Sequence, residues 1–377
     1  MIRRPHGQTL LVIGPAPPPW TGMEVATAAL LEELDRAHIP TIHVNTADPE
    51  DHPGNRGRWT LRNIVMAARH IRLVLRHLVV DTVRTVYVPI SQERPAFLRD
   101  AMFMLMARGL RKRIVVHLHG GAFCDFYARE HWIMRSLIRA TVGKADVGIV
   151  LSPRLRSALD CVVPRERVIS VLLGVRFEPH AGSLNRARRR THKRRVLLLS
   201  NLFPSKGVGI FIEALALVHQ THGDVVGTIA GTWPTREIES EMRSMTTTLG
   251  LERWIEFTGS VAGQAKVNVL EQADIFCLPT FYPLEGTPIV IMEAMAAGLP
   301  VVTTAWRGIP DIVEDGVTGY VLPRPSPELI ASRLLLLLDN EGLRISMGNA
   351  ACCRYHQLFT QDAFGRRIVP VLTQTLS

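Results

Sequence analysis

DIFCLPTFYPLEGTPIVIMEAMAAGLPVVTTAWRGIPDIVEDGVTGYVL, residues 274–322, is the stretch of sequence that says most about the fold. It begins as a short apolar run typical of a buried strand, and the run breaks at Pro279. A loop follows, and Pro288 suits the first turn of a helix that Gly298 ends. The next apolar run, 300–304, indicates a second strand. Strand, helix and strand in this order form the unit from which parallel sheets are built.

The same alternation runs through most of the chain and restarts near residue 196. A first set of strands is predicted at 9–14, 41–45, 83–88, 114–118 and 147–151, with helices at 22–37, 59–79, 94–109 and 129–142. A second set of strands is predicted at 196–200, 225–230, 254–258, 275–278, 301–304 and 320–322. We therefore expect an α/β protein of two doubly wound, Rossmann-like domains facing across a cleft, where the strands' carboxyl ends bind ligands.

Between the two sets lies GSLNRARRRTHKRR, residues 182–195, which is almost free of apolar side chains. We interpret it as a linker between a domain at 1–181 and a domain at 196–355. Residues 1–180 carry 25 Lys and Arg against 16 Asp and Glu, whereas 196–377 carry 12 against 18. This asymmetry favours two units with different partners. Clustered arginines can also bind nucleic acid, but no aromatic residue interleaves the run, so we expect no nucleic-acid partner.

Composition points to a soluble globular protein, with 47% hydrophobic and 21% charged residues. No apolar run reaches the roughly 18 to 20 residues of a spanning helix. The basic start, 1–8, is followed by an apolar run too short for a signal peptide, so we expect no export signal. The five cysteines are scattered and show no metal-ligand spacing. We expect free thiols in a reducing cytoplasm.

The carboxylates of the opening stretch carry a family resemblance. Glu285 and Glu293 are separated by seven residues, and their surroundings resemble the E-x7-E signature of glycosyltransferase family 4, the group 1 glycosyltransferases. Other segments resemble that family in the usual order: IGPAPPPWTGMEVATAALLEEL (13–34), HLHGG (117–121), ADVGIVLSP (145–153), LLSNLFPSKGVGIFIEAL (198–215) and FTGSV (257–261). The resemblance therefore covers nearly the whole chain.

This resemblance implies a GT-B fold and a retaining transfer of a sugar from a nucleotide diphosphate, UDP or GDP, to an acceptor hydroxyl. It implies that 196–355 binds the donor and that 1–181 binds a sugar or lipid-linked acceptor. It also implies that 356–377 forms a C-terminal helix returning to the first domain. The product would belong to glycan, polysaccharide or glycolipid biosynthesis.

Roles in the second domain follow from the matching positions. Glu293 would accept hydrogen bonds from the ribose hydroxyls, and Glu285 would bind hydroxyls of the donor sugar. Gly286 and Thr287 precede the predicted helix, where backbone N–H groups and the helix dipole attract anions. We interpret Glu285 as a group that binds the reacting sugar and not as a covalent nucleophile.

The diphosphate and the first domain supply the remaining predicted positions. Lys206 and the neighbouring loop would hold the diphosphate. The family usually has Gly-Arg-Leu where this chain has Ser-Asn-Leu, so Asn201 offers an amide in place of a guanidinium, which is the better phosphate ligand. Gly22 would let the backbone approach the phosphates or the sugar. His119 would face the sugar, and His117 competes with it for that role.

The predicted chemistry is stabilisation of the departing phosphate oxygen by fixed donors. The chain has no Asp-x-Asp pair, so we expect no metal and no cofactor besides the nucleotide-sugar co-substrate. The leaving phosphate itself would take the acceptor's proton, and no general base is assigned.

The first domain also contains RWTLRNIVMAARHIRLVLRHLV, residues 58–79, an amphipathic helix rich in arginine. Such a helix can pack its apolar face, with Leu61, Ile64, Val65, Ala68, Ile71, Leu75 and Leu78, on its own sheet. Its arginines also suit an anionic membrane leaflet, as does MFMLMARGLRKR at 102–113. We therefore expect a cytoplasmic protein that attaches to the inner face of the cell membrane.

Two alternatives remain at this point. One is a nucleotide-sugar 2-epimerase of similar architecture, and the other is a catalytically silent scaffold that keeps the fold. A nicotinamide dehydrogenase is excluded because no G-x-G-x-x-G follows the first strand.

Overall fold

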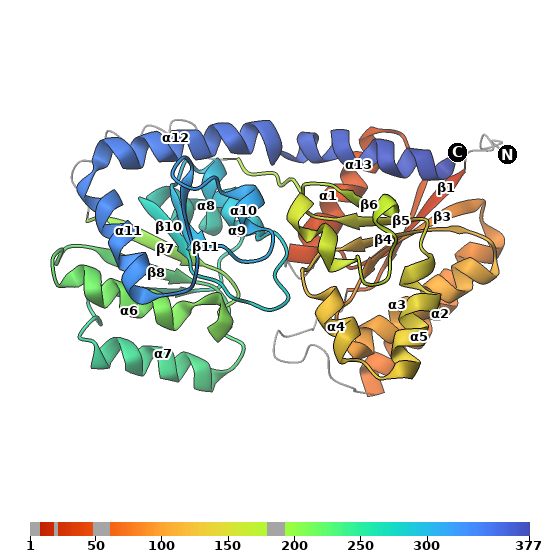
Figure 1. Cartoon of the computed structure of the whole chain (residues 1–377), viewed down its shortest axis with the longest axis horizontal. Helices are drawn as coiled ribbons and strands as arrows, with labels where there is room; N and C mark the ends of the chain where they lie inside the picture. The colour runs from red at the N-terminus through yellow and green to blue at the C-terminus, as the bar shows by residue number, and fades with distance from the viewer. Residues whose placement is uncertain (1–7, 19–21, 48–60, 179–192) are drawn as a thin grey trace. The chain divides into compact units, whose positions relative to one another are not determined.

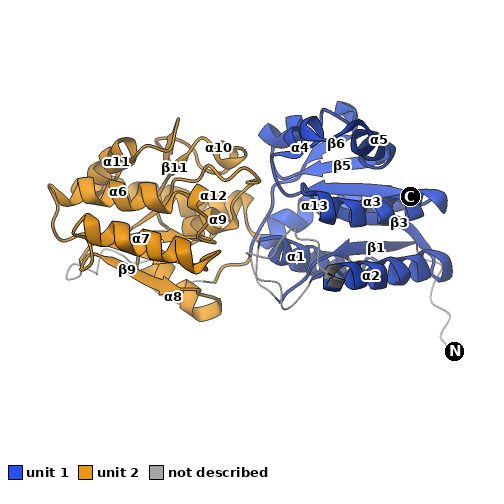
Figure 2. Ribbon diagram, turned by 90° about the horizontal axis from the view of Figure 1, so that it is seen from below, with its two compact units in different colours: residues 1–175, 361–377 blue, residues 176–360 orange. Residues whose placement is uncertain are grey.

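The computed structural model describes residues 8–18, 22–47, 61–178 and 193–377. The chain forms two compact units, one of Met1–Val175 with Gln361–Ser377 and the other of Arg176–Thr360 (Figure 2). The C-terminal helix α13 (Gln361–Leu376) belongs to the first unit, where it packs against α1 (Gly22–Arg36). Most of the predicted linker, 182–192, lies outside the described residues.

The first unit is built on one parallel sheet of six strands in the order β2-β1-β3-β4-β5-β6. Its strands are β1 (Thr9–Gly14), β2 (Thr41–Asn45), β3 (Val83–Ile90), β4 (Arg113–Leu118), β5 (Val147–Val150) and β6 (Val168–Ser170). One face of the sheet is covered by α2 (Leu61–Val80), α3 (Arg94–Gly109), α4 (Phe123–Arg129) and α5 (Trp132–Ala140). The other face carries α1 and α13 (Figure 1), and the position of α1 fits a right-handed crossover from β1 to β2.

The second unit repeats this architecture with six parallel strands in the order β12-β11-β10-β7-β8-β9. Its strands are β7 (Arg195–Leu199), β8 (Val226–Ala230), β9 (Ile255–Gly259), β10 (Ile275–Leu278), β11 (Val301–Thr304) and β12 (Gly319–Leu322). Its helices are α6 (Val208–His219), α7 (Arg236–Thr248), α8 (Gly263–Gln272), α9 (Ile289–Ala296), α10 (Ile309–Ile312), α11 (Pro327–Asp339) and α12 (Glu341–Leu358). The expected pair of doubly wound parallel sheets is thereby confirmed.

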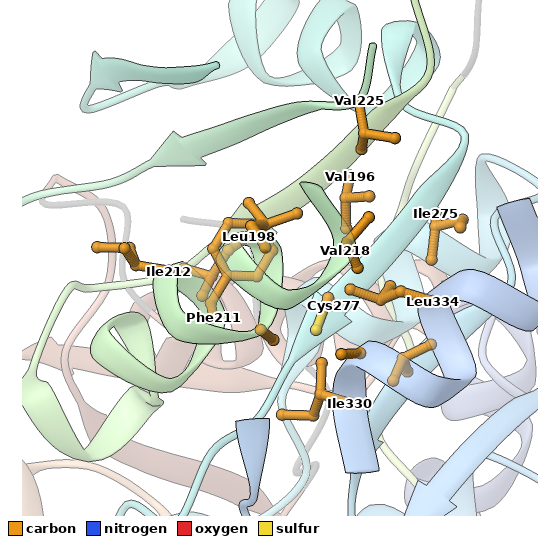
Figure 3. Close-up of a cluster of buried hydrophobic side chains, with 14 of the residues drawn as sticks. Val196, Leu198, Phe211, Ile212, Val218, Val225, Ile275, Cys277, Ile330 and Leu334 are labelled. Atoms are coloured by element: carbon orange, nitrogen blue, oxygen red, sulfur yellow. The ribbon is translucent and has the colours of Figure 1, made fainter. Parts of the chain in front are cut away.

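A dry core fixes the second sheet against α6 and α11, which pack on each other and on the same sheet face (Figure 3). Apolar side chains of the two helices pack against those of strands β7 and β10. The residues of this core include Leu198, Phe211, Ile212, Cys277, Ile330 and Leu334. Full burial of one such aliphatic or aromatic side chain stabilises by about 1.5 to 3 kcal/mol. This core holds the carboxyl ends of β7 and β10 in place.

The structure departs from the prediction at two elements of the first unit. Strand β6 was not predicted, because three residues at a sheet edge are too short to show a periodic pattern. The helix expected at 129–142 is α5, which begins at Trp132 because Glu130 and His131 have extended backbone, and the shorter α4 before it was not predicted. Glu130 is buried between the two helices and accepts a hydrogen bond from Arg94 Nε at 2.8 Å.

The apolar face predicted for α2 packs only in part. Of its members, Leu78 is buried and Ile71 is half-buried, whereas Ile64 and Val65 are 52% and 61% exposed and Ala68 and Leu75 are also exposed. Val74, which the prediction left out, is buried, so the packed side of the helix is shifted from the predicted one. Arg58 and the side chain of Leu61 lie outside the described residues.

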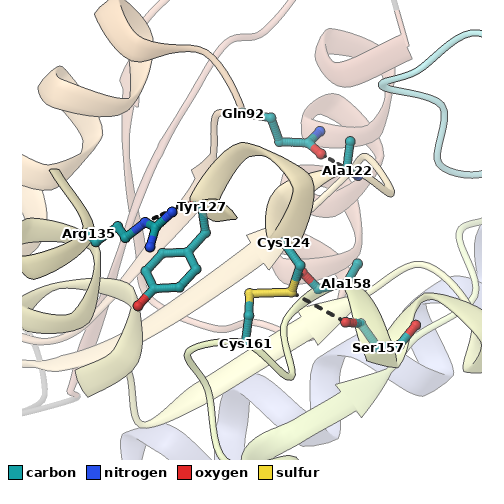
Figure 4. Close-up of a disulfide and its surroundings, with 8 residues drawn as sticks. All are labelled: Gln92, Ala122, Cys124, Tyr127, Arg135, Ser157, Ala158 and Cys161. Atoms are coloured by element: carbon teal, nitrogen blue, oxygen red, sulfur yellow. Dashed lines mark hydrogen bonds between the residues drawn. A yellow bond between two sulfur atoms is a disulfide. The ribbon is translucent and has the colours of Figure 1, made fainter. Parts of the chain in front are cut away.

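The prediction of five free thiols is wrong for two of them. Cys124, in α4, forms a disulfide with Cys161, and their Cα atoms are 5.7 Å apart (Figure 4). The two residues are 37 positions apart in sequence, so only the fold brings them together. Cys277, Cys352 and Cys353 are free. In the described part of the chain, no helix is both long and apolar enough to span a membrane.

The strand order of the second sheet reverses between the neighbouring strands β7 and β10, and the loops that follow these two strands leave the sheet at its carboxyl edge. The two loops approach closely at Gly207, which has φ +83°. A Cβ atom there would lie 2.3 Å from the Pro279 carbonyl oxygen. The backbone N–H of Phe281 donates to the Ser205 carbonyl at 2.8 Å and joins the loops directly. Glycine at 207 is thus a condition for their contact.

We predict that Gly207→Ala lowers the free energy of unfolding by at least about 2 kcal/mol, because alanine meets both the left-handed backbone and the Pro279 carbonyl. Urea unfolding of the purified protein measures the change. The matched control is Gly209→Ala, two positions along in α6, whose Cβ would meet only methionine sulfurs at 3.8 Å. That control gains up to about 1 kcal/mol. Equal stability of the two variants would contradict the role of Gly207.

Candidate functional site

The loops after β7 and β10 bring a lysine and a glutamate together. Lys206 Nζ lies 2.6 Å from Glu285 Oε2, and both side chains are nearly buried, at 12% and 8% exposure. The hydroxyl of Thr280 donates to the same carboxylate oxygen at 2.9 Å. Lys206 ends a short 3₁₀ turn, Pro204–Lys206, which precedes α6. The pair stands at the topological switch point of the second sheet.

An aromatic platform supports the lysine. Lys206 Nζ lies 4.7 Å from the ring centroid of Tyr282. The Phe203 ring stacks on the same Tyr282 ring at a centroid distance of 5.6 Å. Trp306 Nε1 donates to the Tyr282 carbonyl at 2.7 Å and holds this loop in place. A cation over an aromatic face gains about 0.5 to 2 kcal/mol. The ammonium group is therefore held by a carboxylate and a ring at once.

Lys206 can bind an anion without leaving Glu285. An ammonium group has three N–H donors, and Glu285 Oε2 takes one of them. A phosphate oxygen can accept another in a site with little water, where charge-assisted hydrogen bonds are strong. The pair can therefore contact two neighbouring parts of one ligand, an anionic part at Lys206 and a hydroxyl-bearing part at Glu285.

The start of α9 lies beside this pair. Gly286 and Thr287 are buried, and no side chain among the described residues caps the helix at Pro288. The Thr287 hydroxyl is buried without a hydrogen-bond partner. Together with the positive end of the helix dipole, it forms a group of donors suited to an anion. Asn201 lies partly buried immediately after β7, on the loop that leads to Lys206.

Glu293 lies inside α9 and is 4% exposed. Its Oε1 atom forms an ion pair with Lys266 of α8, and its Oε2 atom is buried without a partner. Burial raises the pKa of the Glu293 carboxyl, and Lys266 opposes that rise. Sequence reasoning missed Lys266, because nothing in the local pattern of α8 marks a lysine that reaches a different helix.

The histidines of the first unit form a separate cluster. His117 is fully buried in β4, and its Nδ1 lies 2.5 Å from the Tyr87 hydroxyl. The ring of His119 lies 4.2 Å from that of His117, centroid to centroid. The Nε2 atoms of both histidines are buried without partners. Burial lowers the pKa of His119 to about 4 and keeps that of His117 well below its usual range.

These values make both imidazoles neutral near pH 7, so each offers a hydrogen bond and not a charge. His117 has a protein partner in Tyr87, whereas His119 keeps some exposure at the end of β4. Of the two, His119 is better placed to meet a ligand. Gly22 is the exposed first residue of α1, and residues 19–21 before it lie outside the described part.

The predicted residues therefore fall into two sets. The second unit brings together Lys206, Glu285, Gly286, Thr287 and Asn201 on two neighbouring loops, with Glu293 on the helix that follows. Gly22 and His119 belong to the first unit. Within the described ranges, no group of three or more His, Cys, Asp and Glu side chains is placed to hold a metal ion.

Residues 184–352 match the family model "Glycosyl transferases group 1". The matched region contains the loops after β7 and β10 with their Lys206–Glu285 pair, and α9 with Glu293. The matched region makes up less than half of the chain, and it resembles the group 1 glycosyltransferases.

Curated proteins that this chain resembles include glycosyltransferases. The amylovoran biosynthesis glycosyltransferase AmsK of Erwinia amylovora is 29% identical over 219 residues, which are 57% of this chain and 52% of that protein. A phosphatidyl-myo-inositol mannosyltransferase of Mycobacterium leprae is 34% identical over 155 residues, 40% of each chain. The chain thus spans about half or less of the curated relatives it matches.

Solved structures establish the architecture. The structure of Anabaena Alr3699/HepE in complex with UDP and glucose superposes with a TM-score of 0.72. The match covers 98% of this chain and 100% of that one, at 18% identity. The chain therefore has the GT-B fold, as the resemblance implied.

Proposed function

We propose that this protein is a nucleotide-sugar-dependent, retaining hexosyltransferase acting in polysaccharide, glycan or glycolipid biosynthesis. The observation that carries the proposal is the Lys206–Glu285 pair at the switch point of the second sheet, inside the region that matches the group 1 glycosyltransferase model. The names of the relatives, which include amylovoran biosynthesis and transfer of mannose to phosphatidyl-myo-inositol, support this range of products. A donor carrying UDP or GDP suits the site, and the UDP complex of HepE supports the former.

In this proposal the second unit contacts three parts of the donor, namely the diphosphate, the sugar and the ribose. Lys206, Asn201 and the backbone at Gly286 and Thr287 contact the diphosphate. Glu285, which Thr280 orients by a hydrogen bond, accepts from hydroxyls of the sugar. Glu293 accepts from the ribose hydroxyls through its buried carboxylate.

Cleavage of the bond to the sugar builds positive charge on the anomeric carbon and negative charge on the departing phosphate oxygen. Lys206 and the N-terminal end of α9 stabilise that oxygen, because their N–H groups point at the place where negative charge develops. The acceptor hydroxyl attacks the same face, and the leaving phosphate takes its proton. The roles of His119 and Gly22 stay predictions, in which His119 contacts the sugar as a neutral hydrogen-bonding group. The absence of an Asp-x-Asp pair from the sequence supports transfer without a bound metal.

We predict that UDP or GDP raises the melting temperature of the wild-type protein, since a ligand that binds only the folded state stabilises it. Lys206→Met should lose most of this rise. It should also lower kcat/KM for hydrolysis of UDP-glucose or GDP-mannose, whichever is turned over, by about 10²- to 10³-fold. The matched control is Arg253→Met, which removes one positive charge from an exposed position of the same unit. Undiminished donor hydrolysis by Lys206→Met would reject the assigned function, and interconversion of UDP-sugars without transfer would favour an epimerase.

We further propose that the first unit attaches to an anionic membrane surface, on the cytoplasmic leaflet. Helices α2, α3 and α5 lie on one face of this unit's sheet (Figure 1). They carry these exposed apolar side chains: Ile64, Val65, Leu75, Val79 and Val80 on α2, Met102 and Leu105 on α3, and Trp132 and Ile133 on α5. Exposed arginines accompany them on the same helices, among them Arg69, Arg72, Arg76, Arg108 and Arg139.

Apolar side chains surrounded by arginines suit an anionic lipid surface, because each Lys or Arg near such a surface contributes about 1 kcal/mol to the binding free energy. The negative surface potential of the cytoplasmic leaflet supports that side of the membrane. Free thiols no longer support it, since Cys124 and Cys161 are joined. A lipid-linked acceptor follows from this placement.

Flotation with vesicles of phosphatidylglycerol and phosphatidylcholine at low salt should recover the wild-type protein with the lipid. Val65→Glu should weaken recovery several-fold, because it puts an anion in the apolar surface. Val317→Glu, a change of the same kind at an exposed valine of the second unit, should leave recovery unchanged. The attachment is wrong if the wild type stays with the unbound fraction.

A further inference from the structure

Lys266 of α8 and Glu293 of α9 form an ion pair that joins two helices on the same face of the second sheet. The two residues are 27 positions apart. Glu293 is nearly buried, whereas the Lys266 side chain is 29% exposed. The lysine thus reaches from α8 to a carboxylate on α9 that has little access to water.

The pair leaves half of the carboxylate unused. Lys266 bonds to Oε1, and Oε2 is buried without a hydrogen-bond partner. A buried acceptor without a partner destabilises the folded protein, and more so when it is charged. A structural ion pair has no need of such an oxygen. Its presence points to a donor that arrives with a ligand.

We propose that Lys266 is a positioning residue, which holds Glu293 as a carboxylate with one oxygen occupied, so that the other oxygen accepts the ribose hydroxyls of the donor nucleotide. This inference rests on the proposed function, because it takes Glu293 as the ribose-binding residue. Lys266 itself then contacts no reacting atom and acts through Glu293.

Physical chemistry explains why such a helper is needed. Moving a carboxylate out of water favours its protonated form, and a protonated oxygen donates instead of accepting. An ammonium group in contact counters this and also locks the rotation of the carboxylate. The carboxylate then loses its rotational freedom when the protein folds, so that binding of the nucleotide does not have to order it.

Burial and Lys266 are the two influences on Glu293 in the described part of the chain, and they act in opposite directions on its pKa. Helix α12 also packs against α9, and the Cys352 thiol of α12 donates to the Ala296 carbonyl. Removal of Lys266 therefore leaves burial alone and raises the pKa further. Because the carboxylate form binds, the variant should lose affinity as pH falls and regain it as pH rises.

The test compares UDP and GDP, each with its 2′,3′-dideoxy analogue, by calorimetric titration from pH 6 to pH 8.5. Lys266→Met should bind the wild type's preferred ribonucleotide about tenfold more weakly at pH 7, with the midpoint of its pH profile at higher pH than in the wild type. Its affinity for the dideoxy analogue should match that of the wild type. Lys266→Arg should restore ribonucleotide binding, and Arg253→Met should leave it unchanged.

The possible outcomes distinguish the proposed function from the inference about Lys266. A wild type that binds neither nucleotide overturns the proposed function, and this inference falls with it. A wild type that binds while Lys266→Met keeps its affinity and pH profile overturns the inference alone. Equal weakening of the ribonucleotide and the dideoxy analogue would show a merely structural lysine. Insensitivity of Glu293→Gln to a second change at Lys266 would support the inference, because the lysine acts through that carboxylate.

Discussion

The contact between the loops after β7 and β10 is the constraint on which the rest of the second unit depends. It exists because Gly207 lacks a Cβ and tolerates a left-handed backbone against Pro279. Once the loops meet, Lys206 reaches Glu285 and both lose most of their water. Neither charge would be stable there alone, since an unpaired buried charge is costly. Packing, backbone conformation and electrostatics therefore specify the same arrangement.

That arrangement places opposite charges where one ligand can use both. The ammonium group keeps donors for a phosphate, and the carboxylate keeps lone pairs for hydroxyls, so a nucleotide sugar matches the site in charge and order. Thr280, Tyr282 and Phe203 do not need to touch a ligand in this account. They keep the pair from moving, which preserves its electrostatic effect during transfer.

Much of this was predictable from the sequence, for identifiable reasons. The strands showed as apolar runs, and Lys206, Glu285 and Glu293 stood out through a family pattern. What failed depends on contacts between distant segments. The Cys124–Cys161 disulfide joins segments that only the sheet order brings together, and Lys266 lies on a helix whose own pattern does not point to Glu293. The packed side of α2 was misjudged because periodicity shows an apolar stripe and not which neighbour will cover it.

The most direct test of the central claim is ³¹P NMR of UDP and GDP titrated with the protein. If Lys206 holds the diphosphate, the β-phosphorus resonance of the bound nucleotide shifts and broadens with the wild type. It should return towards its free position with Lys206→Met, at protein concentrations that keep the nucleotide bound. An identical β-phosphorus shift in both proteins would contradict the account, because the diphosphate would then lie away from the Lys206–Glu285 pair.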